Sequence, residues 1–202
     1  MMRSSEQSCA VTGTSGYVGS RISKYFAARG WRVYEFTRRP GARQDPARMQ
    51  VPFQLDSPVD PGAFRHNGIR VLIHCAYDFR VLHWTEIRRV NVEGSARLLR
   101  AAKGGGVDKI IFLSSISAFE GCRSLYGKAK LEIEKVAADL GATIIRPGLV
   151  YGSERPGGMY GSLQRVVARF PIMPLIGSGK HLQYLVHEDD LCELLLGFAA
   201  GR

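Results

Sequence analysis

The sequence predicts an α/β fold of the Rossmann type, in which helices cover both faces of a doubly wound parallel sheet. Three features predict it: short apolar runs alternate with segments of helical periodicity, a glycine-rich turn follows the first apolar run, and polar residues cluster directly after such runs. After Gly148 the chain becomes rich in turn residues. We therefore expect a Rossmann domain over residues 1–150. Residues 151–202 are expected to form a small C-terminal substrate-binding portion, compact or truncated, interleaved with the last strand and helix of the core.

Apolar runs bounded by turn residues are expected to be strands. They are residues 8–12, 31–37, 51–55, 71–75, 109–114 and 143–146. Segments whose apolar residues recur at helical spacing are expected to be helices. They are residues 17–29, 85–103 and 125–140. The tail is expected to add a short helix over 162–169, a strand over 183–186 and a final helix over 188–200.

The glycine-rich turn runs from Thr12 to Gly19, between the first expected strand and the first expected helix. Gly13 allows a tight bend, Gly16 lets a pyrophosphate approach the backbone, and Gly19 lets the helix pack on the strand. The alternative is a glycine-rich turn without a ligand, but the order of strand, turn and helix favours a dinucleotide site. Its expected cofactor-binding residues are Gly13, Ser15, Gly16, Tyr17, Val18 and Gly19.

Tyr126 and Lys130 stand four residues apart in one expected helix. This spacing puts them on the same helical face, where an ammonium group favours the ionised form of a phenol. A serine hydroxyl at the end of the preceding strand can share the same substrate oxygen. We expect Ser115 in that role by register, with Ser114 and Ser117 as alternatives. The pattern predicts proton transfer at a carbonyl or alcohol, against the alternative of an ordinary amphipathic helix.

The chain has 202 residues and a formal net charge of +10, a balance that nucleic-acid-binding proteins share. Its arginines are dispersed, however, and the densest group follows the second expected strand, so the charge favours anionic small molecules over nucleic acid. No apolar run reaches the about 18 residues of a membrane span, and the first residues are polar. We expect a cytoplasmic protein with no membrane partner. Four scattered cysteines without a Cys-x-x-Cys pair argue against a metal site.

The residues after the second expected strand bear on the choice of nicotinamide cofactor. An acidic residue there binds the ribose hydroxyls and selects NAD, whereas an arginine accommodates the 2′-phosphate of NADP. Arg38 and Arg39 stand at this point, and Glu35 lies earlier, inside the strand. NADP is therefore favoured over NAD, with Arg38 as a cofactor-binding residue. The alternative is that both arginines stack on adenine or are solvated.

Together these motifs resemble those of the extended short-chain dehydrogenase/reductase family, in particular its NAD-dependent epimerase/dehydratase branch. The resemblance covers about residues 8–200. Its markers are Thr12-Gly13-x-x-Gly16-x-x-Gly19, Asp56, Asn91-Val92-Glu93-Gly94, Ser114-Ser115, Tyr126-x-x-x-Lys130, Arg146-Pro147-x-x-Val150-Tyr151-Gly152 and Val186-His187-x-x-Asp190-Leu191.

The resemblance implies a catalytic triad in which Tyr126 is the acid/base, Lys130 lowers the pKa of that tyrosine and holds the nicotinamide ribose, and Ser115 polarises the substrate oxygen. It also implies that Asp56 bonds the adenine amino group, the alternative being a residue that starts a helix. Asn91 is expected to support the end of the fourth strand, the alternative being an ordinary helical asparagine. Further expected cofactor contacts are Leu55, Cys75, Ala76, Asn91, Tyr126, Lys130 and Pro147. Weaker expected substrate contacts are Ser117, Tyr77 and Arg155.

The expected function is that of an NAD(P)-dependent epimerase or ketoreductase acting on a hydroxyl or keto carbon of a nucleotide sugar. The alternatives are an NADPH-dependent reductase of a non-nucleotide carbonyl compound, and a non-catalytic protein that senses the cofactor or binds a partner. The resemblance also implies a homodimer through the helices over 85–103 and 125–140. The stretch between Ser115 and Tyr126 is shorter than in many nucleotide-sugar enzymes, which narrows the substrate side of the site. The part after Gly152 is also smaller than the substrate domain that such enzymes usually carry.

Overall fold

Six parallel strands form the central sheet, in the order β3-β2-β1-β4-β5-β6. The computed structural model describes residues 7–41, 45–152, 158–170 and 182–201. The strands are β1 (Ser8–Thr12), β2 (Arg32–Thr37), β3 (Arg48–Pro52), β4 (Val71–His74), β5 (Lys109–Leu113) and β6 (Thr143–Ile145). The order reverses between β1 and β4, which is the switch point where open α/β sheets bind their ligands. This topology confirms the Rossmann-type fold.

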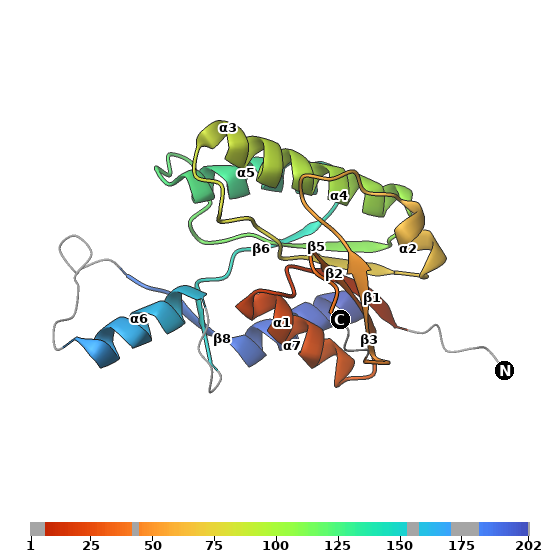
Figure 1. Cartoon of the computed structure of the whole chain (residues 1–202), viewed down its shortest axis with the longest axis horizontal. Coiled ribbons are helices and arrows are strands. Elements are labelled where there is room, and N and C mark those ends of the chain that lie inside the picture. The colour runs from red at the N-terminus through yellow and green to blue at the C-terminus, as the bar shows by residue number, and fades with distance from the viewer. Residues whose placement is uncertain (1–6, 42–44, 153–157, 171–181, 202) are drawn as a thin grey trace.

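Two layers of helices cover the sheet (Figure 1). α1 and α7 pack together on one face, while α4 and α5 cover the other face, where α3 and a π-helical turn, η1, lead directly into α4. The helices are α1 (Tyr17–Ala27), α2 (Gly62–His66), α3 (Trp84–Ile87), η1 (Arg88–Val92), α4 (Glu93–Gly104), α5 (Leu125–Asp139), α6 (Gly158–Arg169) and α7 (Glu188–Ala200). Within the described segments, no helix is both long and apolar enough to cross a lipid bilayer.

The core is divided into two layers because successive strand residues face opposite sides of a sheet. In β1, Cys9 and Val11 are fully buried against the α1 and α7 side, where Phe26 also packs. Ala10 joins the opposite layer, together with Phe112 of β5. Both layers are closely filled, which fixes the ends of the strands and the loops that follow them.

The C-terminal part adds a second, two-stranded sheet. β7 (Leu149–Tyr151) pairs in parallel with β8 (Leu185–His187), and α6 extends away from the central sheet (Figure 1). β8 runs directly into α7, which returns the chain to the central core. The final helix packs on the Rossmann core, as the sequence predicts. The division of the chain into a cofactor-binding part, residues 1–150, and a substrate-binding part, residues 151–202, stays a prediction.

The third strand differs from its expected position, because β3 covers Arg48–Pro52 and not residues 51–55. Arg48 bonds to Asp45 through both its backbone N–H and its guanidinium group, and this turn brings the chain into the sheet early. β3 is an edge strand, so its polar residues can face solvent and the apolar run that the prediction followed is not required. Leu55 and Asp56 lie in the loop beyond it.

Smaller differences concern elements with weak sequence signals. α6 starts at residue 158 and not 162, β8 covers 185–187 and not 183–186, and α2 and β7 were not expected. The expected helix over 85–103 is an α3–η1–α4 unit that begins one residue earlier. In each case the signal is short, and tertiary contacts determine where the element begins.

A glycine in α4 predicts a sharp difference between two substitutions in the same helix. A Cβ atom at Gly94 would lie 2.1 Å from the Leu55 carbonyl oxygen, whereas one at Gly104 would meet nothing within 4 Å. We expect Gly94→Ala to lower the free energy of unfolding by about 2–4 kcal/mol, because backbone must move to admit the methyl group. Gly104→Ala should leave it unchanged or slightly raised. Urea denaturation measures both, and equal stabilities for the two variants would contradict the packing described.

Candidate active site

The expected site residues gather where β1, β2, β4 and β5 end, since parallel strands present their carboxyl ends along one edge of the sheet. The glycine turn follows β1, Arg38 follows β2, Cys75 to Tyr77 follow β4, and Ser115 follows β5. Tyr126 and Lys130 reach the same edge from α5. Arg155 lies outside the described residues.

The glycine turn is folded too tightly for larger residues. Gly13 has a φ of 74°, and a Cβ atom there would lie 3.0 Å from the Ala76 backbone. A Cβ atom at Gly19 would lie 2.4 Å from the Gly13 carbonyl oxygen, and the Gly16 N–H donates to that oxygen at 2.9 Å. The exposed N-cap of α1, Gly16, makes no side-chain capping bond. The turn thus offers the open helix N-terminus and close backbone approach that a pyrophosphate requires.

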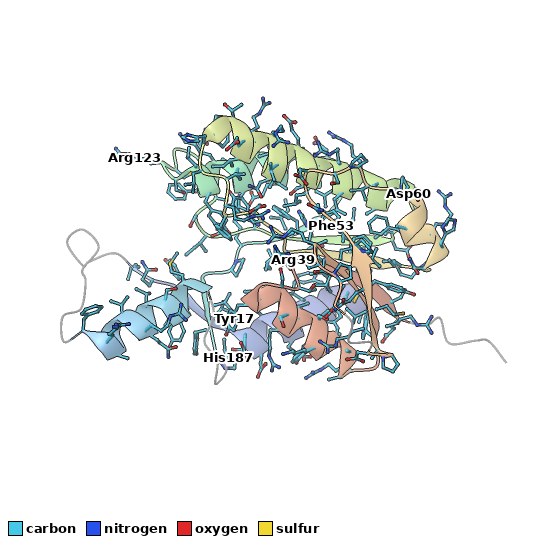
Figure 2. The ribbon with its side chains drawn as sticks, viewed as in Figure 1. Tyr17, Arg39, Phe53, Asp60, Arg123 and His187 are labelled. Carbon is cyan, nitrogen blue, oxygen red and sulfur yellow. The ribbon has the colours of Figure 1, made fainter. Side chains whose placement is uncertain are left out.

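The other residues of the turn have different surroundings. Ser15 is exposed at the tip, and the side chain of Val18 packs into the core beside α7. Tyr17 donates a hydrogen bond from its hydroxyl group to the Glu188 carboxylate at the start of α7, and His187 lies nearby (Figure 2). The side chain of Tyr17 therefore ties the glycine turn to the C-terminal part of the chain.

A buried hydrogen-bonded chain joins the turn to β4. The Thr12 hydroxyl oxygen accepts the backbone N–H groups of Cys75 and Ala76, each at 3.0 Å, and lies 2.8 Å from His74 Nδ1. Because that hydroxyl already accepts two protons, its own proton is donated to Nδ1. His74 Nε2–H therefore donates to Ser95 Oγ, at 2.8 Å. Burial, and to a lesser extent the charge of Lys130, lowers the pKa of His74 to about 3, so the ring is neutral.

The start of α5 brings the tyrosine to the serine loop. Ser124 caps the helix by accepting the Gly127 N–H at 3.0 Å, which places Tyr126 in the first turn. A Cβ atom at Gly127 would lie 2.2 Å from the Ser117 carbonyl oxygen, so only glycine lets the helix approach this loop so closely. The Ser115 side chain lies within hydrogen-bonding reach of the Tyr126 hydroxyl group, where it lowers the pKa of the phenol.

The three candidate serines have different partners. Ser114 is buried and donates to the Glu134 carboxylate, which is paired with Arg146. Ser115 faces Tyr126 and also accepts the Ser117 N–H at 3.1 Å. The alternation of side chains at the end of β5 thus turns Ser114 away from the tyrosine and Ser115 towards it.

Lys130 lies one helical turn beyond Tyr126 and is buried, with 2% of its surface exposed. Its Nζ atom donates to the Leu113 carbonyl oxygen at 2.7 Å and lies 5.8 Å from the centre of the Tyr126 ring. Burial lowers the pKa of Lys130 to about 8. A carbonyl at the end of β5 therefore positions the ammonium group behind the tyrosine.

The expectation that Lys130 lowers the pKa of Tyr126 is not met in this structure. Burial of the phenol raises its pKa, and the hydrogen bond with Ser115 only partly opposes that increase. The Tyr126 ring packs against Tyr77 and Phe79, with ring centroids 4.9 and 5.6 Å away. These apolar contacts disfavour the phenolate. The tyrosine is thus held as a proton donor.

Residues after β4 contact both the glycine turn and Tyr126, through the Ala76 backbone and the Tyr77 ring respectively. Cys75 is half-buried, and desolvation raises the pKa of its thiol to about 12, so the thiol is protonated at neutral pH. Burial likewise raises the pKa of Tyr77 to about 12. Pro147 accepts the Ile116 N–H through its carbonyl oxygen at 3.1 Å, and so fixes the serine loop from the β6 side.

The opposite end of the site contains the residues expected around the adenosine. Arg38 lies 3.3 Å from the Asp78 carboxylate, while Glu35 is occupied by the Ser23 hydroxyl inside the structure. Asp56 is exposed, and the preceding Leu55 is buried. The placement of Glu35 agrees with the expectation that it cannot reach a ribose.

Asn91, in the π-helical turn, fixes the loop that follows β4. Its side chain accepts the Asp78 N–H at 2.6 Å and donates to the Asp78 carbonyl oxygen at 3.1 Å. Both polar atoms of the amide are therefore used by the backbone of one residue. Asp78 and its neighbour Arg80 have no recognisable sequence motif, and sequence reasoning did not select them.

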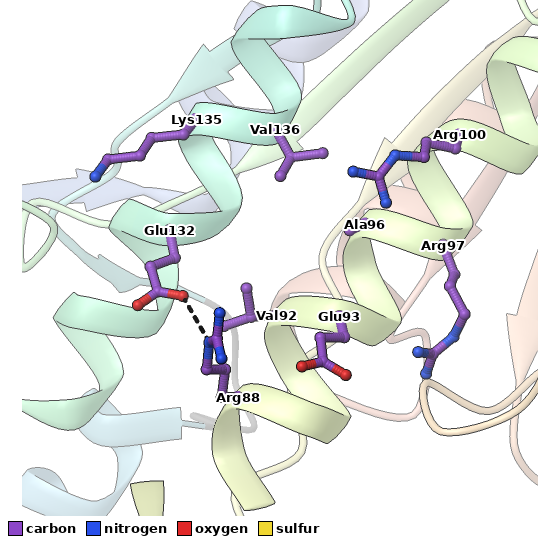
Figure 3. Close-up of a pocket in the computed structure, with 9 residues that line it drawn as sticks. All are labelled: Arg88, Val92, Glu93, Ala96, Arg97, Arg100, Glu132, Lys135 and Val136. Atoms are coloured by element: carbon purple, nitrogen blue, oxygen red, sulfur yellow. Dashed lines mark ion pairs between the residues drawn. The ribbon is translucent and has the colours of Figure 1, made fainter. Parts of the chain in front are cut away.

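A separate groove of about 550 Å³ lies between α4 and α5 (Figure 3). Charged side chains dominate it, including an ion pair between Arg88 and Glu132 at 3.5 Å. It lies on the outer side of these helices and not at the carboxyl edge of the sheet. Among the described residues, no group of three or more His, Cys, Asp or Glu side chains is arranged to hold a metal ion.

The fold and the glycine turn are those expected of a dinucleotide-binding protein, and Tyr126 and Lys130 lie at the same edge of the sheet as the turn. Residues 9–200 match the family model described as "NAD dependent epimerase/dehydratase family". The chain belongs to that family, a branch of the extended short-chain dehydrogenase/reductases, which are NAD(P)-dependent enzymes.

Two curated relatives show the range within the family. Ceramide reductase of Caulobacter vibrioides is 30% identical over 94% of this chain and 60% of its own length. UDP-glucose 4-epimerase of Vibrio cholerae is 26% identical over 96% of this chain and 67% of its own length. This chain thus spans about two thirds or less of these relatives.

Solved structures share the fold. MoeE5 in complex with UDP-glucose and NAD superimposes with a TM-score of 0.79 at 23% identity, covering 96% of this chain and 72% of that one. The terminal R domain from the myxalamid PKS-NRPS biosynthetic pathway gives a TM-score of 0.77 at 18% identity, covering 96% and 62%. At these identities the likeness concerns the fold alone.

The neutral state of His74 predicts a pH-dependent stability. Its folded pKa, about 3, lies below the ordinary value of about 6.5, so the unfolded chain binds the extra proton. The stabilisation is complete above about pH 6.5 and is lost as the pH falls towards the folded pKa, by up to about 1.4 kcal/mol per pH unit. Urea denaturation between these limits should show a steeper loss for the wild type than for His74→Gln, whose amide can keep both hydrogen bonds. Parallel losses would contradict the assignment.

Proposed function

We propose that the protein is an NAD(P)-dependent oxidoreductase or epimerase that acts on a hydroxyl or keto carbon of a nucleotide sugar. The proposal rests on the placement of three side chains at the end of the sheet that holds the glycine turn: Ser115 lies within hydrogen-bonding reach of Tyr126, and Lys130 follows one helical turn later. The proposal is supported by the family membership and by a nucleotide-sugar epimerase among the relatives.

In the proposed reaction, Tyr126 transfers a proton to or from the substrate oxygen. The nicotinamide cofactor, when bound, gives or takes the hydride at the adjoining carbon. For reduction of a ketone, the Tyr126 hydroxyl proton goes to the oxygen while Ser115 holds that oxygen in place. A protonated tyrosine is the state that burial favours, and the Lys130 ammonium group lies 5.8 Å from the centre of the ring that gives up the proton. For oxidation the same transfers run in reverse.

The glycine turn is the proposed site for the cofactor's pyrophosphate, and Arg38 is the proposed ligand for its 2′-phosphate. NADP is favoured over NAD because Arg38 follows β2, while Glu35 is used inside the structure. MoeE5, whose fold this chain shares, is bound to NAD in its solved structure. The proposed preference for NADP therefore rests on Arg38 and Glu35 of this chain and not on its likeness to MoeE5.

A second candidate function is reduction of a non-nucleotide carbonyl compound. The Tyr77, Phe79 and Tyr126 rings form a contiguous aromatic surface beside the proposed acid, and 68% of Phe79 is exposed. Such a surface suits an apolar group attached to the reacting carbon. The ceramide reductase among the relatives supports this reading. A third reading, a cofactor sensor or partner-binding protein without turnover, is disfavoured by the presence of both Tyr126 and Lys130.

The homodimer implied by the resemblance also remains a proposal. The surfaces available to it are the outer sides of α4 and α5, which line the groove in Figure 3. The groove carries side chains of both charges, including Glu93 and Arg100, and opposite charges can pair across a two-fold axis.

An assay of the purified protein tests the proposed function. We expect NADPH- or NAD-dependent conversion of a uridine diphosphate sugar or its 4-keto form, and Tyr126→Phe should lower the rate by about a thousandfold because the proton donor is lost. Cofactor affinity should change less than about twofold, since binding rests on the turn and the arginines. Tyr25→Phe serves as the control, since it removes a hydroxyl group that bonds to Glu193 of α7 and not to any residue of the candidate site.

Three results of this assay separate the readings. Turnover of long-chain ketones and not of nucleotide sugars would select the second candidate. No turnover with tight cofactor binding would select the third. Full activity of Tyr126→Phe would overturn the assigned chemistry.

A further inference from the structure

A cluster of charged residues from three loops lies at the adenosine end of the site. The Asp78 carboxylate accepts hydrogen bonds from Arg80, with an Nε to Oδ1 distance of 2.9 Å, and pairs with Arg38 at 3.3 Å. Asp56, which follows β3, is close enough to help raise the pKa of Arg80, although Asp78 is the larger cause. The ends of β2, β3 and β4 therefore converge on these side chains.

Asp78 is fixed far more firmly than an ordinary surface carboxylate. Asn91 binds both its backbone N–H and its backbone carbonyl oxygen, and the Arg80 N–H donates to Oδ1 at 3.0 Å. Only 12% of its side chain is exposed. The hydrogen bonds from Arg80 are the main cause of a pKa lowered to about 2, so the carboxylate is charged at neutral pH.

The two arginines have the opposite character. The side chain of Arg38 is 45% exposed and that of Arg80 is 69% exposed. One covered carboxylate thus holds two guanidinium groups whose remaining N–H donors face solvent. Asp78 is the direct partner of both arginines, while Asp56 acts on Arg80 only as a minor cause of its raised pKa, so guanidinium donors remain for a further anion.

We propose that Arg38 and Arg80 together bind the 2′-phosphate of NADP(H), with Asp78 as the positioning residue that holds both guanidinium groups at the adenosine end. This inference rests on the proposed function, because it assumes the cofactor site there. A phosphate dianion accepts bidentate hydrogen bonds from two arginines better than a monoanionic carboxylate does. Arg38 lies on the loop after β2 and Arg80 on the loop after β4, so the phosphate is held by residues of both loops.

The negative charge of Asp78 also lowers the affinity for the 2′-phosphate. A carboxylate beside the phosphate repels it and competes for the arginines, so Asp78 sets a limit on NADP(H) affinity. Asp78→Asn keeps the backbone bonds to Asn91 and the Oδ1 oxygen that the Arg80 N–H uses, but it removes the charge and replaces Oδ2, the acceptor for Arg38, with an amide donor, so that the guanidinium groups are released to the phosphate. A merely structural role predicts weaker binding for this variant, whereas the proposed role predicts tighter binding.

Calorimetric titration of the full chain with adenosine 2′,5′-bisphosphate and with adenosine 5′-monophosphate isolates the 2′-phosphate from the nicotinamide. We expect Arg80→Ala and Arg38→Ala each to weaken binding of the bisphosphate by about fivefold to tenfold at low salt, and to change binding of the monophosphate by less than about twofold. Asp78→Asn should tighten the bisphosphate by about threefold. The control is Arg70→Ala, since Arg70 pairs with Asp108 at the opposite end of β4.

The titrations separate an error in the 2′-phosphate site from an error in the proposed cofactor site as a whole. If the wild type binds both probes but Arg80→Ala weakens them equally, or not at all, this inference is wrong while the cofactor site stands. Weaker bisphosphate binding by Asp78→Asn, in a variant whose unfolding midpoint is unchanged, would also overturn it. If the wild type binds neither probe, nor NADPH, the proposed function itself fails.

Discussion

The hydroxyl group of Thr12 joins the two loops between which the candidate site lies. It accepts the N–H groups of Cys75 and Ala76 and donates to His74, while the Gly13 that follows packs on the Ala76 backbone. The glycine turn and the loop after β4 are therefore held at one separation. Because Asn91 then binds the same β4 loop at Asp78, the position of the adenosine end depends on this link as well.

Buried polar contacts are used here to set geometry. His74, Ser114 and Lys130 are all buried, yet each side chain has a specific partner, and within the described residues no buried side-chain nitrogen or oxygen lacks a hydrogen bond. Satisfied networks of this kind give a unique arrangement, whereas losing one partner exposes the full desolvation penalty of the other. The candidate site is thus built on contacts that are costly to disturb.

The sequence predicts the parts of this architecture that depend on local pattern. The glycine turn, the tyrosine and lysine one helical turn apart, and the Rossmann topology follow from spacing and periodicity. The position of β3 could not be predicted, because an edge strand needs no apolar run and a turn at Asp45 decides where it begins. The pairing of Arg80 with Asp78 and the raised pKa of Tyr126 arise from contacts between distant segments. No local sequence pattern predicts the pairing of Arg80 with Asp78 or the raised pKa of Tyr126.

We propose that this chain forms a nicotinamide dinucleotide site that favours the phosphorylated cofactor. Titration of the purified protein with NADPH and with NADH, followed by the fluorescence of the reduced nicotinamide, tests it most directly. We expect saturable binding of NADPH and of NADH, with NADPH bound about tenfold more tightly. Saturable binding of neither cofactor, or tighter binding of NADH, would contradict it.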